Sequence, residues 1–263
     1  MLLIAACVLA RLLAADFPSG EINPAAAGMD AQRIARIPGR MQEFVKAGKA
    51  AGIVTLVARH GHIALLNAVG YQDLETRTPM RTNTLFRLMS MTKPMTGTAV
   101  MMLVDDGRIS VIDPVEKWLP EFKGPQVKVK CAQASTGPEC LAKPAHAITI
   151  ADVLSHVSGI QEPPKGSRTL AEFAAAAAKL PLEFEPGTMW RYRTAGTNVA
   201  GRIVEVVSGE PYERFMAERL FSPLGMRDTT FFPRAEDAGR IATVYTAQNG
   251  ALKRAEMALP KPS

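Results

Sequence analysis

The amino-acid sequence predicts an α+β fold built as two packed lobes. Three observations along the chain predict it. A segment with apolar residues at helical spacing comes first, two β-rich runs joined by a tight turn follow, and a long, mostly helical region makes up the remainder. With 263 residues, the chain is long enough to bury a substantial hydrophobic core.

The first helix is expected from Asp30, which can cap its N-terminus, to about Ala47. The runs 52–59 and 62–71 are then expected to pair as a β-hairpin that turns at a His-Gly pair. Both faces of the first run are apolar. This pattern predicts that the strand lies inside a covered sheet and not at a solvated edge.

The remainder of the chain is predicted to form helices separated by short loops. The longest runs from about Ser90 to Asp106. Because Pro94 is tolerated only near a helix start, this helix is expected to begin at or beside Ser90. Shorter helices are expected to start near Thr149, Thr169, Ala195 and Pro211.

Composition and charge exclude several kinds of function. The formal net charge of +6 is spread along the chain without a run of Lys and Arg, so neither nucleic acid nor a membrane surface is indicated as a partner. The four His have no metal-ligand spacing, and no glycine-rich phosphate-binding loop is present. We therefore expect no metal and no organic cofactor. The sequence gives no indication of the oligomeric state.

The N-terminal residues 1–15 have the character of a secretory signal. Their apolar stretch is too short to span a bilayer and ends in small residues before Asp16. Arg11 interrupts that stretch, and a lipoprotein signal with lipid at Cys7 is the less favoured alternative. We therefore expect a periplasmic or secreted protein without a stable membrane span, in which a single domain covers residues 16–263.

Two cysteines, Cys131 and Cys140, remain once such a signal is removed. They lie in a stretch that reads as a loop between Gly124 and Pro144. An even pair in an exported protein favours a disulfide. The alternative is a pair of unbonded thiols in a cytosolic protein.

Ser90 and Lys93 form the first candidate catalytic pair. Residues three apart at a helix start lie on one face, so the lysine amine can reach the serine hydroxyl. The helix start also offers N–H groups that stabilise an oxyanion. Taken alone the spacing is weak evidence, because an ordinary helix cap with a solvated lysine has the same pattern.

The surrounding sequence, LFRLMSMTKPMTGTAVMMLVDDGRISVIDPVEKWLPEF, closely resembles the nucleophile region of the β-lactamase-related serine hydrolases. That family includes class C β-lactamases, penicillin-binding peptidases and carboxylesterases. The similarity continues through ITIADVLSHVSGI and GRIVEVVSGEPYERFMAERLFSPLGMRDTTF, so it covers about residues 24–235. The resemblance implies a β-lactamase/transpeptidase-like fold, with Ser90 as the acylated nucleophile and Lys93 as its base partner.

The second motif of the family, Tyr-any-Asn, aligns with Tyr192-Arg193-Thr194. The resemblance implies that Tyr192 acts with Lys93 as general base and later as acid to the leaving group. The alternative for Tyr192 is a half-buried aromatic residue with a hydrogen-bonded hydroxyl. Thr194 replaces the Asn that β-lactamases usually keep, which favours ester over lactam hydrolysis. Asn198, one turn further on, is a candidate to supply the amide instead.

Three other residues are expected to be packed and not catalytic. His156 is expected on an amphipathic helix, and Trp118 in the core or at its rim. Trp190 is expected to be a core or rim residue as well, with the edge of the cleft beside Tyr192 as a further option for it.

The third motif of the family, Lys or His followed by Thr or Ser and then Gly, has no counterpart after Tyr192. In the family it lies on a strand near the C-terminus and supplies an oxyanion donor. We therefore expect a C-terminally truncated member that lacks the strands completing the sheet. Loss of one such donor typically lowers turnover by on the order of 10²–10³.

The leading functional hypothesis is a serine hydrolase that acts through a Ser90 acyl-enzyme on small-molecule esters or related acyl compounds. A β-lactamase or a D-Ala-D-Ala-type peptidase, which would take lactam or peptide substrates, is the alternative within enzymes. Outside enzymes, the alternative is a penicillin-recognising or cell-wall-binding module. The sequence contains no G-x-S-x-G, which argues against the α/β-hydrolase design.

Overall fold

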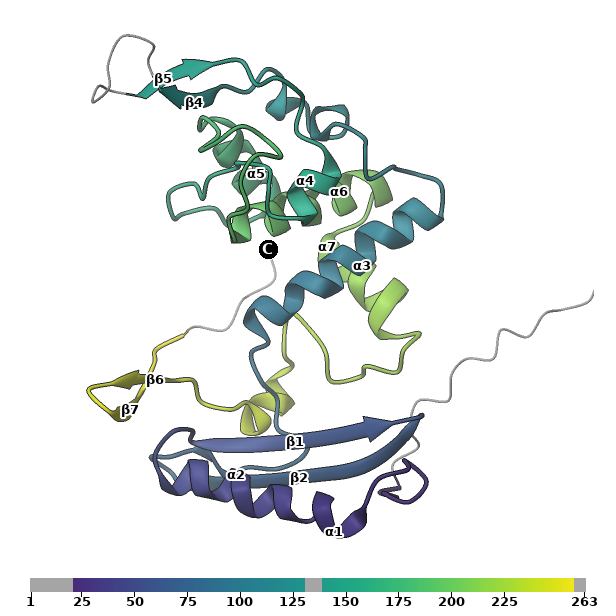
Figure 1. Cartoon of the computed structure of the whole chain (residues 1–263), viewed down its shortest axis with the longest axis vertical. Helices are drawn as coiled ribbons and strands as arrows, with labels where there is room; N and C mark the ends of the chain where they lie inside the picture. The colour runs from purple at the N-terminus through teal and green to yellow at the C-terminus, as the bar shows by residue number, and fades with distance from the viewer. Residues whose placement is uncertain (1–20, 131–138, 258–263) are drawn as a thin grey trace, which may run out of the picture. The chain divides into compact units, whose positions relative to one another are not determined.

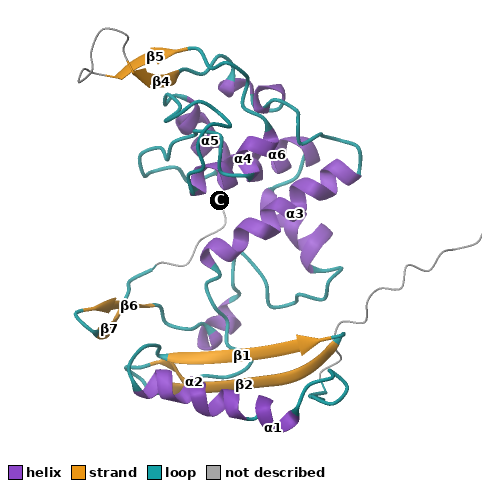
Figure 2. Cartoon of the chain, viewed as in Figure 1, coloured by secondary structure: helices purple, strands orange, loops and turns teal. Residues whose placement is uncertain are grey.

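The computed structural model describes residues 21–130 and 139–257, which form two compact units. We call residues 21–87 and 234–257 the sheet unit, and the described residues between 88 and 233 the helical unit. Figures 1 and 2 show their elements. Helices combined with antiparallel strands give the α+β class that the sequence predicts. The signal-like residues 1–15 lie outside the described residues.

The sheet unit is built on a β-hairpin. Strands β1 (Gly52–Arg59) and β2 (His62–Asp73) pair antiparallel, and β3 (Thr78–Pro79) pairs with the other edge of β2. The two turn residues, His60 and Gly61, have positive φ angles of 51° and 74°. Two successive positive φ angles are typical of the type I′ turn, whose twist matches that of the strands. The predicted hairpin is therefore confirmed.

Strand β1 lies at an edge of this sheet, so the prediction of a covered position was wrong. Within the described residues β2 is its strand neighbour, and the side chain of Leu56 is 58% exposed. Helix α2 (Arg36–Lys46) packs against β1 and β2, as Figure 1 shows. The sequence of β1 is apolar on both faces, but in the described residues only some of its apolar side chains are covered.

The expected helix from Asp30 is divided into α1 (Ala31–Ile34) and α2. The Asp30 carboxylate caps α1 by accepting a backbone N–H at 3.0 Å, as predicted. The division lies four residues before Pro38, which has no N–H to donate to the carbonyl of Ile34. One missing hydrogen bond thus accounts for the break.

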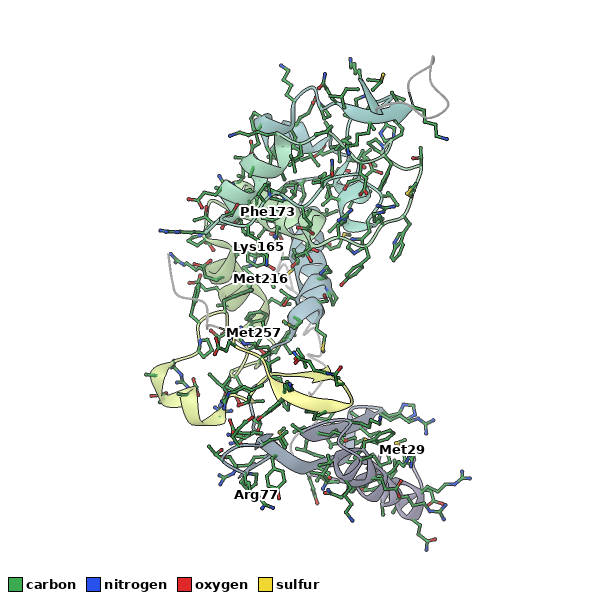
Figure 3. The ribbon with its side chains drawn as sticks, turned by 90° about the vertical axis from the view of Figure 1, so that its left-hand side faces the viewer. Met29, Arg77, Lys165, Phe173, Met216 and Met257 are labelled. Atoms are coloured by element: carbon green, nitrogen blue, oxygen red, sulfur yellow. The ribbon has the colours of Figure 1, made fainter. Side chains whose placement is uncertain are left out.

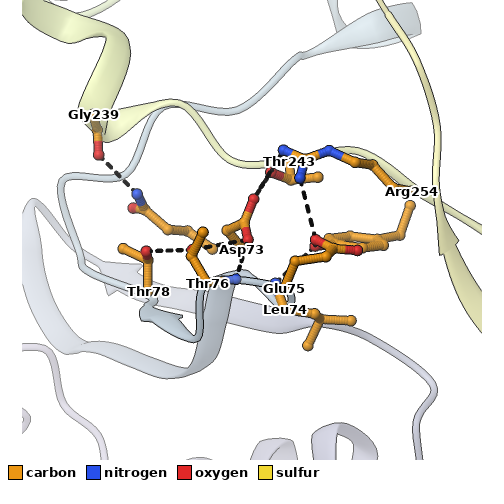
Figure 4. A network of polar contacts seen from close by, with 10 residues as sticks. Asp73, Leu74, Glu75, Thr76, Thr78, Gly239, Thr243 and Arg254 are labelled. Carbon is orange, nitrogen blue, oxygen red and sulfur yellow. Dashed lines mark hydrogen bonds and ion pairs between the residues drawn. The ribbon is translucent and has the colours of Figure 1, made fainter.

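Residues 234–257 complete the sheet unit with η5 (Ala235–Arg240) and a hairpin of β6 (Tyr245–Gln248) and β7 (Ala251–Arg254). Figure 4 shows the polar network that fastens this segment to the end of β2. The Asp73 carboxylate accepts from the Thr243 hydroxyl at 2.6 Å and from Arg254 at 2.9 Å.

Asp73 is the centre of that network. It also accepts the backbone N–H and the hydroxyl of Thr76, both at 2.8 Å. The hydrogen bond from Thr243, followed by those from Thr76 and the charge of Arg254, holds the pKa of Asp73 far below its usual range. Because every partner favours the ionised form, the carboxylate stabilises the native state.

The helical unit is organised around α6 (Thr194–Ser208), whose residues Val199, Ala200, Ile203 and Val204 are fully buried. Helices α3 (Thr92–Asp105), α4 (Ile150–Leu154) and α5 (Leu170–Ala178) pack against it. Figure 3 shows the side chains of Phe173 and Met216 among these helices. The remaining helical elements of this unit's described residues are η1 (Met89–Met91), η2 (Val115–Lys117), η3 (Pro120–Phe122), α7 (Tyr212–Phe215) and η4 (Met216–Phe221).

The stretch expected to be a loop instead contains a hairpin of β4 (Val127–Lys130) and β5 (Glu139–Ala142). Cys140 on β5 is disulfide-bonded. Its expected partner, Cys131, lies outside the described residues. In the described parts of the chain, no helix is long and apolar enough to cross a membrane.

The Asp73 network predicts a pH-dependent contribution to stability. Asp73→Asn keeps the shape of the side chain and removes its charge, so we expect the free energy of unfolding to fall by about 1–2 kcal/mol at pH 7. The native pKa is depressed, so the contribution is complete above the unfolded pKa of about 4 and declines as pH falls towards the native pKa.

Urea unfolding of wild type and variant between pH 3 and pH 7 measures this difference. Glu256→Gln, which removes an exposed carboxylate, is the matched control and should leave stability unchanged. A destabilisation by Asp73→Asn that is the same at pH 3 and pH 7 would show that the charge is not what matters.

Candidate active site

Ser90 lies exposed in the first turn of a helix, as its sequence position predicts. The 3₁₀ turn η1 runs directly into α3, in which Pro94 is the third residue. Met89, immediately before Ser90, has a φ of 50°. A left-handed conformation at a residue other than glycine costs roughly 1–2 kcal/mol, and outside turns such residues cluster at functional sites. The backbone is therefore strained beside the candidate nucleophile.

Lys93 joins two helices that are far apart in the sequence. Its Nζ donates to Ser90 Oγ at 3.2 Å on the same helix start and to Thr194 Oγ1 at 3.4 Å on α6. The same Nζ lies 4.7 Å from the centroid of the Tyr192 ring. The lysine amine is thus the common neighbour of three of the residues that the sequence singled out.

Tyr192 completes the cluster of Ser90, Lys93 and Thr194. Hydrogen bonding with Ser90, and then with Lys93, lowers the pKa of the Tyr192 phenol, and the charge of Lys93 lowers it further. The side chain is 49% exposed, so a ligand can reach it from solvent. A phenol with a lowered pKa beside a hydroxyl and an amine is suited to move a proton between them.

The segment that carries Tyr192 is held by two carboxylates that the sequence analysis missed. Glu162 accepts the Ala195 N–H at 2.7 Å, and a negative charge is favourable at the N-terminus of a helix such as α6. Glu183 forms ion pairs with Arg191 and, at 2.7 Å, with Arg193. Glu162 precedes Ala195 by 33 positions and Glu183 precedes Arg191 by eight, and no local pattern marks either acid.

Asn198 is not brought into this cluster. It lies one turn further along α6 and lines a separate cavity of about 890 Å³ together with Thr92 and Thr197. Within the described residues it makes no hydrogen bond to Ser90 or Lys93. Residues 194 and 198 share a face of α6, but Asn198 lies a full turn, about 5.4 Å, further along the helix axis, where it faces the separate cavity.

His156 lies beyond the end of α4, so its expected place on a helix was wrong. Its φ of 61° is left-handed, and its ring centroid lies 4.7 Å from that of Tyr192. Trp190 is 65% exposed with its ring 6.4 Å from Tyr192, whereas Trp118 packs partly buried against the core. The left-handed turn that follows α4 brings His156 to the site, and the local sequence pattern does not predict this turn.

A second cavity, of about 250 Å³, adjoins the cluster. Lys93 and His156 line it together with the apolar side chains of Met101, Val153 and Leu154. In the described parts of the chain, no group of three or more His, Cys, Asp or Glu side chains is arranged to hold a metal ion. The side chains gathered at the site offer a hydroxyl, an amine, a phenol and an imidazole.

The contacts of Tyr192 predict how its phenol titrates. Ser90→Ala removes the hydrogen bond that lowers the pKa most, and Lys93→Met removes both a hydrogen bond and a charge. Each variant should raise the Tyr192 pKa towards its ordinary value of 10.0. Ultraviolet difference titration measures this, and Tyr192→Phe identifies the signal. An unchanged titration in both variants would contradict the convergence of these groups.

Comparison with known proteins gives a consistent family. The family model described as Beta-lactamase matches residues 38–263. Esterase EstB from Burkholderia gladioli is 33% identical over 232 residues, which are 81% of this chain and 55% of that protein. Protein Rv1367c from Mycobacterium tuberculosis is 36% identical over 220 residues, which are 78% of this chain and 53% of that protein. This chain thus spans about half the length of the curated relatives it matches.

The solved structures agree. EstCE1, described as a hydrolase with promiscuous acyltransferase activity, is 30% identical with a TM-score of 0.73, over 86% of this chain and 60% of that one. The octameric penicillin-binding protein homologue from Pyrococcus abyssi is 25% identical with a TM-score of 0.65, over 86% and 50%. From the family match and this shared architecture, the chain belongs to the β-lactamase family of serine hydrolases and has the β-lactamase/transpeptidase fold.

Proposed function

We propose that this chain hydrolyses small-molecule esters through an acyl-enzyme on Ser90. The observation that carries the proposal is the convergence of one amine and one phenol on one exposed hydroxyl. Lys93 Nζ lies 3.2 Å from Ser90 Oγ, and hydrogen bonding with both residues lowers the pKa of Tyr192. An activated serine needs such a base within hydrogen-bond reach.

In the proposed reaction, Lys93 and Tyr192 together accept the Ser90 proton as Oγ attacks the ester carbonyl. The negative charge that develops on the carbonyl oxygen is stabilised by N–H groups at the start of the helix, which have no partner within the helix. The Tyr192 hydroxyl then donates its proton to the departing alkoxide. Water, deprotonated by the same pair, attacks the acyl carbonyl, and the proton returns to Ser90 Oγ as the acid leaves.

Esters are favoured over lactams and peptides by Thr194. Its hydroxyl accepts from Lys93 at 3.4 Å, at the place where the lactam-hydrolysing members of the family usually carry an Asn side chain. A hydroxyl has one donor hydrogen, whereas an amide side chain offers both an oxygen acceptor and an NH₂ donor for a substrate amide. The similarity to esterase EstB supports an ester substrate, and the similarity to EstCE1, a hydrolase with acyltransferase activity, supports acyl transfer.

A β-lactamase or peptidase is the second candidate. The similarity to a penicillin-binding protein homologue favours it.

We also propose that the protein is exported. The signal-like character of residues 1–15 supports export, and so does the disulfide at Cys140, because disulfides persist mainly in oxidising compartments.

Hydrolysis of p-nitrophenyl acetate by the 263-residue chain tests the proposal. We expect turnover that Ser90→Ala abolishes and that Tyr192→Phe and Lys93→Met each lower by on the order of 10²–10⁴ through loss of proton transfer. Met91→Leu, which changes an exposed neighbour in the same turn, is the control and should leave turnover unchanged.

The same preparations assayed with nitrocefin separate the candidates. We expect the turnover of p-nitrophenyl acetate to exceed that of nitrocefin. In the Thr194→Asn variant, the ratio of the two turnover rates should be smaller. Nitrocefin hydrolysis faster than ester hydrolysis would establish the second candidate instead. A stable penicillin adduct in the intact mass, without turnover of either substrate, would identify a binding module and overturn the hydrolase proposal.

A further inference from the structure

We propose that His156 is a positioning residue for Tyr192, acting as a neutral imidazole with its proton on Nε2. It holds the phenol where it meets Ser90 and Lys93. This inference rests on the proposed function in giving Tyr192 a part in proton transfer. The contacts that support it are independent of any reaction.

The first support is in the backbone. The backbone N–H groups of the two residues that flank Tyr192 both donate hydrogen bonds to His156. Arg191 N donates to the His156 carbonyl oxygen at 2.9 Å, and Arg193 N approaches His156 Nδ1 at 3.5 Å. The main chain that carries Tyr192 is therefore held from two sides by a single residue, 36 positions earlier in the sequence.

The second support is the stacking of the rings. The ring centroids of His156 and Tyr192 lie 4.7 Å apart with the planes tilted by 41°, and Trp190 meets the edge of the imidazole at 6.2 Å. The phenol is half-exposed, so burial alone does not orient it. The imidazole supplies a fixed face, and displacing a catalytic group by about 1 Å is enough to lower a rate by about 10².

The charges around the ring favour its neutral form. Burial first, and then the charge of Lys93 on α3, lower the pKa of His156. Arg191 and Arg193 line a small cavity with His156, and their guanidinium groups are paired with Glu183. An Nδ1 that accepts an N–H must be unprotonated, which places the single proton of the neutral ring on Nε2.

The backbone of His156 is itself in a conformation that few residues with side chains adopt. Its φ of 61° is left-handed. Asn, Asp and His are the residues other than glycine most often found with a left-handed backbone. Of these three, only His carries a ring that can contact Tyr192. A left-handed residue after α4 aims both the carbonyl and the imidazole at residues 191–193.

The test compares His156→Asn with His156→Gly. Both tolerate the left-handed backbone, but only Asn keeps a side-chain acceptor for the Arg193 N–H. We expect His156→Gly to return the Tyr192 pKa towards 10.0 and to lower kcat by at least tenfold with KM unchanged. His156→Asn keeps the acceptor but loses the ring, so its Tyr192 pKa and its kcat should lie between those of the wild type and of His156→Gly.

The ultraviolet titration of Tyr192 does not need turnover. It therefore tests the positioning role of His156 even if the chain hydrolyses no ester. A failure of the positioning role can thus be distinguished from a failure of the proposed function. A His156→Gly chain that is folded, by its far-ultraviolet circular dichroism, and that retains the lowered Tyr192 pKa would overturn the positioning role.

Nitrogen-15 NMR measures the protonation of His156 directly in the wild-type chain. The His156→Asn chain serves only to assign the signal. We expect His156 to show an unprotonated Nδ1 and a protonated Nε2 at pH 7, and to titrate below its ordinary value of 6.5. A doubly protonated ring at pH 7, or a proton on Nδ1, would overturn the proposal.

Discussion

The packing of α3 against α6 is the constraint on which the candidate site depends. Ala99, Val100 and Leu103 of α3 are fully buried in the same cluster as Val199 and Ile203 of α6. The hydrophobic effect favours this contact at roughly 25 cal/mol for each Å² of apolar surface removed from water. Fixing the two helices side by side also fixes the positions of their first turns, and these carry the reacting groups.

Both helices present their N-terminal ends to the site. Ser90 stands at the entry to α3, and Thr194 is the first residue of α6. Helix N-termini favour negative charge, so an oxyanion or a phenolate is stabilised where two of them meet. The amine of Lys93 lies between them and bonds to both, which makes it the electrostatic partner of any anion formed there.

Around this centre, a second set of contacts restrains the segment that carries Tyr192. Glu162 satisfies an N–H at the start of α6, Glu183 pairs with the two flanking arginines, and His156 receives two backbone N–H groups. A half-exposed tyrosine without these restraints would sample several rotamers, each a loss of alignment with the hydroxyl of Ser90. The reacting groups and the restraints all belong to the helical unit.

The sequence by itself determined the α+β class, the hairpin, the helix start at Ser90 and the grouping of Ser90 with Lys93. These depend on local rules: apolar periodicity, the tolerance for Pro94 in a first turn, and the proximity of residues three apart on a helix. Tyr192 and Thr194 came from resemblance to a family, because nothing local relates them to residues a hundred positions away.

Only the tertiary structure decided which other side chains meet these residues. Asn198 lines a separate cavity, and His156, which the sequence pattern places on a helix, lies beside Tyr192 after the end of α4. The direction in which a chain leaves a helix, and the acid that reaches the start of α6 from 33 positions earlier, follow from the packing of the whole unit. A one-dimensional pattern records spacing along the chain, whereas these contacts depend on distances across it.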